Sequence, residues 1–367
     1  MSRLGIGIIG GGYMGKAHAA AYGSVGTLFE TTLRPELEMV CATSISSAEK
    51  YQKNYGFKSA TTDWKEVVNN PNIDAVVIAS PQSTHCEIAL AAFKNRKHVF
   101  CEKPLGASVE ESRTMLTAAE ASGMVHMTGF NYIRTPASQY ARQLVVEGRI
   151  GDITWFRGEH TEDFLADPSI PTNWRTTGKS NGTMGDLAPH MINAARALVG
   201  PISSLTACVE TVHANRPGGK VTNDDQAQMM CRFESGAQGH LFFSRVATGR
   251  KMGYAYEIHG TKGSIKFDQE DQNALHLYTI DSVEKERGFK KILTGPAHPD
   301  YKAFCQGPGH GTGYQDQIII EANDFLRAIH EGRNIWPTFS EGMEVNRVVS
   351  AALDSSEKNI WVKIADY

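Results

Sequence analysis

Two segments of this sequence have residue types and spacing suited to chemistry on a bound nucleotide. One is the glycine-rich run Gly10-Gly11-Gly12-Tyr13-Met14-Gly15, and the other is Lys103, which follows a short apolar stretch that begins at His98. In open α/β sheets, ligands bind in the crevice beyond the carboxyl ends of the strands. A lysine at such a strand end is unusual unless its charge acts on a bound group. Together the two segments predict a nicotinamide-dependent dehydrogenase.

The glycine run lies between an apolar strand at residues 4–9 and a helix expected over residues 13–22. Its glycines permit a tight turn and a close approach of the backbone to a pyrophosphate, and the helix N-terminus offers free N–H groups to the phosphates. Three consecutive glycines also suit a plain loop, but the flanking strand and helix favour a cofactor. The expected cofactor contacts are Gly10, Gly12, Tyr13, Met14 and Gly15.

The residue that usually contacts the adenosine ribose is missing. An Asp or Glu at the end of the second strand would accept a hydrogen bond from the 2′-hydroxyl. The chain instead has Cys41, Ala42, Thr43 and Ser44 there, with no Arg or Lys beside them to pair with a 2′-phosphate. The hydroxyls of Thr43 and Ser44 suit either ribose. The sequence slightly favours NAD and keeps NADP as an alternative.

The second chemical cluster is the run Gly-Asp-Leu-Ala-Pro-His-Met-Ile-Asn at residues 185–193. A helix that begins near Asp186 places Asp186, His190 and Asn193 on one face, at i, i+4 and i+7. His190 suits a general base for a hydroxyl proton, because imidazole titrates near neutrality. Lys103 would stabilise the developing alkoxide, and Asp186 would orient His190 or bind a neighbouring hydroxyl. The alternative is structural, with Asp186 as an N-cap and His190 as a core histidine.

The elements that position these groups change in type along the chain. Up to about residue 129, strands and helices alternate, and the apolar run at residues 75–79 is typical of a strand buried on both faces. Repeated units of this length require a parallel sheet with right-handed crossovers. Beyond that point, longer strands alternate with period two, as at residues 226–233, and indicate a mostly antiparallel sheet.

The sequence therefore predicts an α/β protein with a Rossmann dinucleotide-binding domain at residues 1–130 and a second α/β domain at residues 131–367. The other expected strands are at residues 37–42, 98–101, 125–128, 154–160, 205–212, 237–246, 255–260 and 264–268. The other expected helices are at residues 47–55, 85–95, 109–122, 137–147, 186–198, 315–331 and 341–359, with long loops at 168–179 and 298–312.

Composition restricts the class of protein. The chain of 367 residues is 41% hydrophobic and 21% charged, which fits a soluble globular protein, and its net charge of −3 favours neither nucleic acid nor a membrane surface as a partner. We expect no secretory signal and no apolar run long enough to cross a bilayer. The six cysteines are scattered without a Cys-x-x-Cys pair, so we expect no metal site and a cytoplasmic location.

Several motifs give the chain a resemblance to the Gfo/Idh/MocA oxidoreductases, a family that contains inositol and glucose dehydrogenases and glucose–fructose oxidoreductase. The match extends over nearly the whole chain. Its Glu-Lys-Pro triplet is specific, whereas its glycine loop is not. The motifs are Gly10-x-Gly12-x-x-Gly15-x-x-His18, Ser80-Pro81 through His85, Glu102-Lys103-Pro104, Gly129-Phe130-Asn131 with Arg134, and Asp186-x-x-x-His190.

The resemblance implies that Lys103, Asp186 and His190 are catalytic. It also implies a substrate-binding second domain with an open antiparallel sheet that makes oligomer contacts, so we expect a homotetramer. The further cofactor contacts that it implies are Ser80, Pro81, His85, Glu102 and Lys103. The chain departs from the family at Asn193, where inositol dehydrogenases commonly have a substrate-binding aspartate, and this leaves the exact polyol open.

Further residues are candidates for substrate contacts beside Lys103, Asp186, His190 and Asn193. Asn131 and Arg134 follow the last strand of the first domain, where a position facing the cleft and an exposed domain-linker role are about equally expected. Trp174 and Arg175 lie in a long loop, and an aromatic ring beside a guanidinium suits a sugar, although Trp174 also suits an anchor for the loop. His310, in a glycine-rich loop, is a weaker candidate.

We expect an NAD(P)-dependent dehydrogenase that oxidises a ring secondary hydroxyl of a cyclic polyol or sugar, such as an inositol, a hexose or a glycoside, to a ketone. One alternative is an NAD-retaining enzyme that oxidises a sugar transiently to release a glycosidic bond. Another is a non-catalytic dinucleotide-binding sensor. Retention of Lys103, Asp186 and His190 argues against the sensor, because a sensor needs only the glycine loop.

Overall fold

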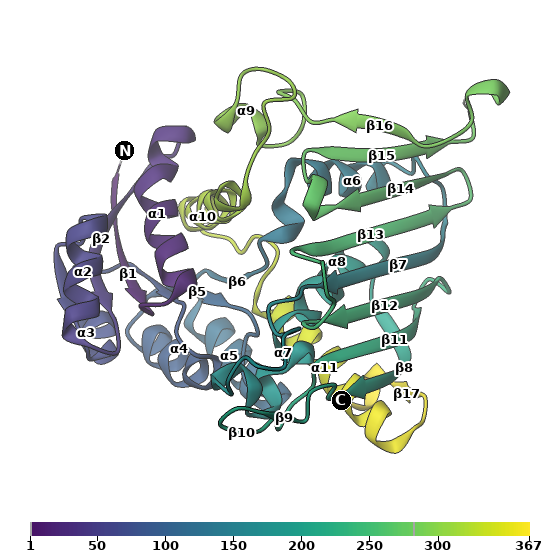
Figure 1. Ribbon diagram of the computed structural model, residues 1–367. Coiled ribbons are helices and arrows are strands. Elements are labelled where there is room, and N and C mark those ends of the chain that lie inside the picture. Colours follow the sequence, from purple (N-terminus) through teal and green to yellow (C-terminus); the bar gives the residue numbers. More distant parts are fainter. Residues whose placement is uncertain (1, 282) are drawn as a thin grey trace. The chain divides into compact units, whose positions relative to one another are not determined.

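The computed structural model describes residues 2–281 and 283–367, and the chain forms two compact units (Figure 1). Unit 1 consists of the residues up to Arg134 and Gly313–Asn346, and unit 2 consists of Thr135–Thr312 and Arg347–Tyr367. The later segment joins unit 1 because helix α10 (Tyr314–Glu331) packs beside helix α1 (Tyr13–Leu28). The expected domain boundary between residues 130 and 131 stays a prediction.

Unit 1 is built on a six-stranded parallel sheet in the order β3-β2-β1-β4-β5-β6. Its strands are β1 (Ser2–Ile9), β2 (Leu33–Cys41), β3 (Ser59–Thr61), β4 (Ala75–Ile78), β5 (His98–Glu102) and β6 (His126–Gly129). The strand order reverses between β1 and β4, which creates the switch point where dinucleotides bind in such sheets. The predicted Rossmann fold is confirmed.

Helices cover both faces of this sheet (Figure 1). They are α1, α2 (Ile45–Tyr55), α3 (Trp64–Asn69), α4 (His85–Lys94), α5 (Val109–Ser122), α10 and the first part of α11 (Phe339–Lys358). Helix α1 continues beyond the expected end near Tyr22 and ends at Leu28. Gly23 and Gly26 disfavour a helix by propensity, but Val25 is fully buried, and packing overrides a weak propensity.

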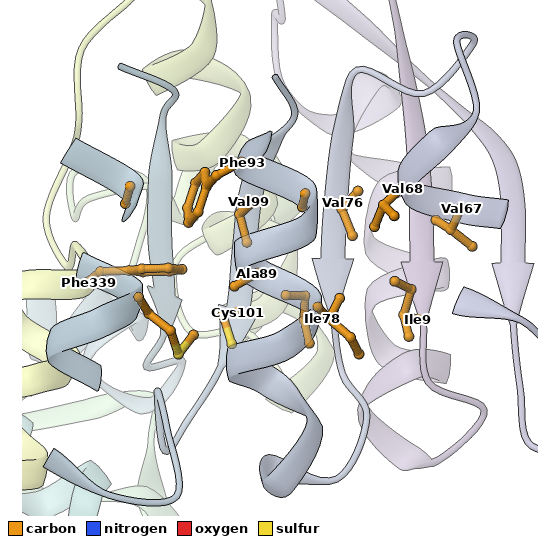
Figure 2. Packing of buried hydrophobic residues seen from close by; sticks show 14 of the residues in the cluster. Ile9, Val67, Val68, Val76, Ile78, Ala89, Phe93, Val99, Cys101 and Phe339 are labelled. Carbon is orange, nitrogen blue, oxygen red and sulfur yellow. The ribbon is translucent and has the colours of Figure 1, made fainter. Parts of the chain in front are cut away.

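An apolar core lies between the sheet and helices α3, α4 and α5 (Figure 2). Strand β4 is buried at all four positions, as expected for a parallel sheet that is covered on both faces. Alternate residues of the central strands therefore point into this core. The labelled members in Figure 2 are Ile9, Val67, Val68, Val76, Ile78, Ala89, Phe93, Val99, Cys101 and Phe339.

Unit 2 contains a nine-stranded sheet in the order β16-β15-β14-β13-β7-β12-β11-β8-β17. Its neighbours pair antiparallel, except for the parallel pair β7 and β12. The strands are β7 (Ile153–Thr161), β8 (Ile202–Glu210), β11 (Gln226–Phe233), β12 (Gln238–Ser244), β13 (Gly253–Gly260), β14 (Gly263–Asp268), β15 (Ala274–Thr279), β16 (Lys290–Leu293) and β17 (Val362–Lys363), with a separate hairpin of β9 (Asn215–Arg216) and β10 (Gly219–Lys220). The predicted, mostly antiparallel sheet is confirmed.

The outer strands β15 and β16 are absent from the expected set, and their burial explains why. Only the first two residues of β15 are buried, and β16 begins with two lysines, so neither strand alternates between buried apolar and exposed polar residues. Strand β11 does alternate, with Ala227, Met229 and Cys231 buried and Gln228 and Arg232 exposed. Sequence periodicity therefore detects the centre of this sheet and misses its end.

Helices α6 and α8 lie on one face of this sheet (Figure 1). The helices of unit 2 are α6 (Pro136–Val146), α7 (Thr183–Asp186), α8 (Ala188–Val199), α9 (Tyr301–Phe304) and the end of α11. A side chain at Gly158 of β7 would clash with Met191 of α8, so this glycine permits the close approach of helix and sheet. The exposed side chains of Trp155 and Met230 lie on the same sheet.

Candidate active site

The glycine loop joins β1 to α1, and its backbone lies close to other backbone atoms at two of its glycines. Gly10 has a φ of +136°, and a Cβ there would clash with the carbonyl of Ala79 after β4. A Cβ at Gly15 would clash with the carbonyl of Gly10. The loop therefore requires glycine at both positions, as the sequence predicted from a tight turn and close helix packing.

The space next to Gly12 suits a pyrophosphate. A Cβ at Gly12 would meet no atom within 4 Å, and the first turn of α1 carries no acidic residue. The hydroxyl of Tyr51 donates a hydrogen bond of 2.8 Å to the Gly12 carbonyl. Tyr13 is 67% exposed, and the hydroxyl of Tyr314 donates to Met14 Sδ at 3.5 Å. The residues present fit a dinucleotide phosphate at the N-terminus of α1.

The predicted ribose residues follow the end of β2. Ser44 is the N-cap of α2, and its Oγ accepts a hydrogen bond of 3.3 Å from the N–H of Ser47. Thr43 is exposed beside it. One of the two hydroxyls already stabilises a helix end, and a contact of either one with a ribose stays a prediction.

His85 connects the loops that follow β4 and β5. Its side chain is 1% exposed, with Nε2 3.0 Å from the carbonyl of Ser80 and Nδ1 3.0 Å from the carbonyl of Pro104. Burial lowers the pKa of His85, although both carbonyls oppose this effect. A neutral imidazole donates to one carbonyl at a time. His85 therefore fixes the backbone on both sides of the strand ends, and direct cofactor contacts of Ser80, Pro81 and His85 stay predictions.

Lys103 directly follows β5 and is half-buried. The preceding Glu102 is 6% exposed, and its Oε1 lies 2.7 Å from Nε2 of His18 on α1. The backbone N–H of Lys103 donates to Glu102 Oε2 at 3.3 Å. Glu102 thus ties the strand end that carries Lys103 to the helix that begins at the glycine loop. A direct contact of Glu102 with a cofactor stays a prediction.

Glu321 on α10 is a buried carboxyl group that no sequence pattern indicated. It is fully buried. Burial raises the pKa of Glu321 to about 8; the negative charge of Glu102 adds to this shift, and the positive charge of Arg134 and a backbone hydrogen bond from Phe130 oppose it. Burying a charge is costly, so the protonated form is favoured at neutral pH.

This shift predicts a pH-dependent stability that Glu321→Gln removes. A raised pKa in the folded state contributes stability that is complete below the unfolded pKa of about 4.5 and is lost as the pH rises through about 8. The unfolding free energy of the wild type, relative to Glu321→Gln, should therefore fall between pH 5 and pH 9. Urea denaturation of both proteins across this range measures the difference. The exposed control Glu120→Gln should show no such trend, and a constant difference for Glu321→Gln would contradict the assignment.

Asn131 and Arg134 are used inside unit 1. Asn131 is 4% exposed, and its Nδ2 donates to Gln317 Oε1 at 3.0 Å. Arg134 is 5% exposed and forms an ion pair with Asp324 of α10. The alternative of an exposed linker is wrong, because both side chains are buried, and their contacts join the end of the Rossmann segment to the returning helix. Substrate contacts of both residues stay predictions.

The helix expected from Asp186 onward is interrupted at residue 187. Asp186 ends the short helix α7, and α8 begins at Ala188 with Pro189 in its first turn. The alternative in which Asp186 is merely an N-cap is therefore wrong, because Asp186 is the last residue of α7 and the N-cap of α8 is Leu187. Proline is favoured in the first helical turn because it has no N–H to satisfy, and this explains the restart. His190 and Asn193 still share one face of α8 at i and i+3.

His190 is 7% exposed and lies next to a second histidine. The ring of His160 on β7 lies 5.5 Å from the ring of His190, centroid to centroid. Nδ1 of His160 donates to the carbonyl of Leu187, the residue before α8, at 2.9 Å, and Nε2 lies 3.2 Å from Glu162 Oε1. His160 therefore anchors the turn that positions His190. Asn193 is 1% exposed on the same helix.

Trp174, Arg175 and Asp186 come together within unit 2. The Arg175 guanidinium lies 4.2 Å from the centre of the Trp174 ring, and its Nε lies 3.8 Å from Asp186 Oδ2. Trp174 is 60% exposed. A carboxylate, a guanidinium and an aromatic face offer an acceptor, donors and a flat apolar surface, which are the groups that bind the hydroxyls and ring face of a sugar. His310 is exposed in the glycine-rich loop, and its substrate contact stays a prediction.

No helix in the described part of the chain is long and apolar enough to cross a membrane. Within residues 2–281 and 283–367, no group of three or more His, Cys, Asp or Glu side chains is placed to hold a metal ion.

Comparisons with known proteins give a consistent assignment. Residues 4–130 match the model of an oxidoreductase family with an NAD-binding Rossmann fold, and residues 138–266 match the GFO/IDH/MocA C-terminal domain. The chain is 38% identical over 385 aligned positions to levoglucosan dehydrogenase of Pseudarthrobacter phenanthrenivorans, covering 99% of both chains. It is 26% identical to inositol 2-dehydrogenase of Rhizobium meliloti over 98% of both. A solved structure of levoglucosan dehydrogenase with NADH and levoglucosan has a TM-score of 0.97 at 39% identity, covering 99% of this chain and 100% of that one.

Proposed function

The chain belongs to the Gfo/Idh/MocA family of oxidoreductases, and we propose that it uses NAD to oxidise a ring secondary hydroxyl of a sugar or cyclic polyol to a ketone. The arrangement of Trp174, Arg175 and Asp186 carries the sugar part of the proposal, because it combines an aromatic face with paired donors and acceptors. An anhydrohexose such as levoglucosan is the first candidate, since the levoglucosan dehydrogenase relative aligns over the full length.

Oxidation of the carbinol removes two hydrogens, one as a hydride and one as a proton, and different groups contribute to these steps. The cofactor, when bound, supplies a hydride acceptor. We assign to His190 the role of general base for the hydroxyl proton and to Lys103 the stabilisation of the developing oxyanion. Asp186, paired with Arg175, would bind a neighbouring hydroxyl of the sugar.

NAD is the proposed partner of the glycine loop, with NADP as the alternative. The family model for residues 4–130 is an NAD-binding one, and β2 ends without an arginine or lysine in the run Cys41 to Ser44 that would pair with a 2′-phosphate. Within its family the protein is further proposed to be a cytoplasmic homotetramer whose exposed sheet face, which carries Trp155 and Met230, contacts a second copy.

The proposal predicts reduced cofactor when the purified protein is mixed with NAD and a suitable sugar. Absorbance of the reduced nicotinamide should rise with levoglucosan, or with another member of a panel of inositols, hexoses and glucosides, and should rise faster with NAD than with NADP. Release of free sugar from a glycoside without net cofactor reduction would instead indicate the transient-oxidation enzyme. Tight cofactor binding with neither activity would indicate the sensor.

A further inference from the structure

The loop that carries Trp174 and Arg175 is held from behind along its backbone. All five consecutive carbonyls from residue 174 to residue 178 accept hydrogen bonds, so the backbone has little freedom to move. The side chain of Asn181 donates to the carbonyls of residues 174 and 177. The side chain of Asn223 donates to the carbonyls of residues 175 and 178, and Arg245 also donates to that of residue 175. The backbone N–H of Thr222 donates to the carbonyl of residue 176.

Arg245 is the charged centre of this support. It follows β12 and is 1% exposed, and its Nη1 donates to the carbonyl of Arg175 at 2.7 Å. Its Nε and Nη2 donate to Asp225 Oδ1 at 3.1 and 3.0 Å, and Nη2 also donates to Asn223 Oδ1 at 2.8 Å. Removing two charges from water is costly, so a buried pair of this kind is weak evidence of a role in stability alone. The geometry that the pair fixes is the stronger reason for its presence.

The residues next to Arg245 continue this support toward Asp186. The fully buried Asp225 accepts a hydrogen bond of 2.8 Å at its carbonyl from the hydroxyl of Thr183. Asp224 Oδ2 accepts from the N–H of Met184 at 2.7 Å. Thr183 and Met184 form the first turn of α7, which ends at Asp186. One buried segment therefore fixes both the Arg175 backbone and the helix that carries Asp186.

The opposite side of the loop is poorly satisfied within the protein. The Arg175 Nε has no hydrogen-bond partner among the described residues, and its 3.8 Å distance to Asp186 Oδ2 is too long for a hydrogen bond. Trp174 leaves most of its surface in solvent. A rigid backbone that presents a guanidinium side chain that is 42% exposed and an exposed aromatic ring is preorganised for a ligand that supplies hydroxyl oxygens and a flat ring face.

We propose that Arg245 is a positioning residue for sugar recognition, which acts through the Arg175 carbonyl to hold the Arg175 guanidinium between Trp174 and Asp186. The inference rests on the proposed function and deepens it, since it assigns to this loop the affinity for the sugar ring. The chemistry selected is a hydroxylated ring with vicinal hydroxyls: Arg175 donates to one oxygen and Asp186 accepts from its neighbour. Arg245 itself has no contact with the substrate in this scheme.

The test is a comparison of Arg245→Lys with Arg347→Lys. Lysine keeps the charge next to Asp225, but its single ammonium lacks the planar fork that also reaches the Arg175 carbonyl. We expect Arg245→Lys to raise KM for the sugar at least tenfold, with kcat within about threefold and the dissociation constant of NAD unchanged. Arg347 donates to the backbone carbonyls of Ile364 and Tyr367 in the same unit, so Arg347→Lys controls for the loss of a structural arginine.

Hydrogen exchange without substrate provides a second readout that does not depend on turnover. Arg245→Lys should accelerate amide exchange in residues 174–186 and leave the central strands of unit 2 protected. If Arg245→Lys does not fold, Asn223→Ala removes the other side-chain donor to the Arg175 carbonyl, and the same KM rise is expected. A lower melting temperature with unchanged KM and unchanged loop exchange would overturn the positioning role. A wild type that oxidises no sugar would refute the proposed function, and the exchange data would still decide whether Arg245 fixes the loop.

Discussion

Replacement of Lys103 by alanine should lower kcat by about 10²–10³-fold while NAD binds as tightly as it does to the wild type. Loss of one preorganised donor to a developing oxyanion typically has this size. Lys103 follows the buried end of β5, and its backbone N–H donates to the Glu102 carboxylate. The carbonyl of the next residue, Pro104, is hydrogen-bonded to His85. Because that support consists of other side chains, the alanine variant should keep the local backbone and lose only the charge. Stopped-flow or steady-state rates, together with fluorescence titration of NADH, separate the two effects.

The matched control for Lys103 is Lys94→Ala, an exposed lysine at the end of α4 in the same unit. It removes the same charge from the protein without removing it from the strand end. Equal losses of rate in both variants would indicate a general electrostatic effect. A Lys103→Ala enzyme with unchanged kcat would refute the oxyanion role. Lys103→Arg should recover only part of the rate, because a guanidinium keeps the charge but has a different shape.

The sequence predicted those features of the fold that depend on residues close together in the chain. The requirement for glycine at Gly10 and Gly15 follows from the tight turn and the close backbone approach that the loop makes. The Rossmann strands follow from short apolar runs such as that of β4. The family resemblance added expected cofactor contacts that no local pattern identifies, namely those of Ser80, Pro81 and His85. Lys103, in contrast, was already a candidate as a lysine at a strand end.

The buried polar clusters were not predictable in the same way. His18 and Glu102 are 84 positions apart in the chain, and Arg245 and Asp225 are 20 apart. No periodicity connects such residues, because the contact exists only after the sheets have formed. Glu321 reads as a polar residue in an amphipathic helix, yet it is fully buried.

The break at residue 187 is a different case, because a local signal was present. Pro189 follows Asp186 by three residues, and proline is enriched in the first turn of a helix. Giving that preference more weight moves the expected start of the helix to residue 188. Asp186 then belongs to a separate turn that pairs with Arg175. With this change, Asp186 is no longer a residue on the same helix as His190. It is instead a partner of the loop that carries Arg175.

His190→Ala is the second substitution with a large expected effect, a decrease in kcat of about 10²–10⁴-fold, which is the usual contribution of a general base. His160 anchors the turn before α8 through the Leu187 carbonyl, so the helix should keep its position without the imidazole. Hydride transfer from a carbinol requires the hydroxyl proton to leave, and in the variant only water or hydroxide accepts it. The rate of His190→Ala should therefore increase with pH up to the limit of stability, whereas the wild-type rate should level off once the imidazole is neutral. His330→Ala, an exposed histidine on α10, is the control and should retain the wild-type profile. A His190→Ala enzyme with the wild-type pH profile and rate would place the base elsewhere, and Asp186→Asn would then distinguish a carboxylate base from a sugar-binding carboxylate by whether kcat or KM changes.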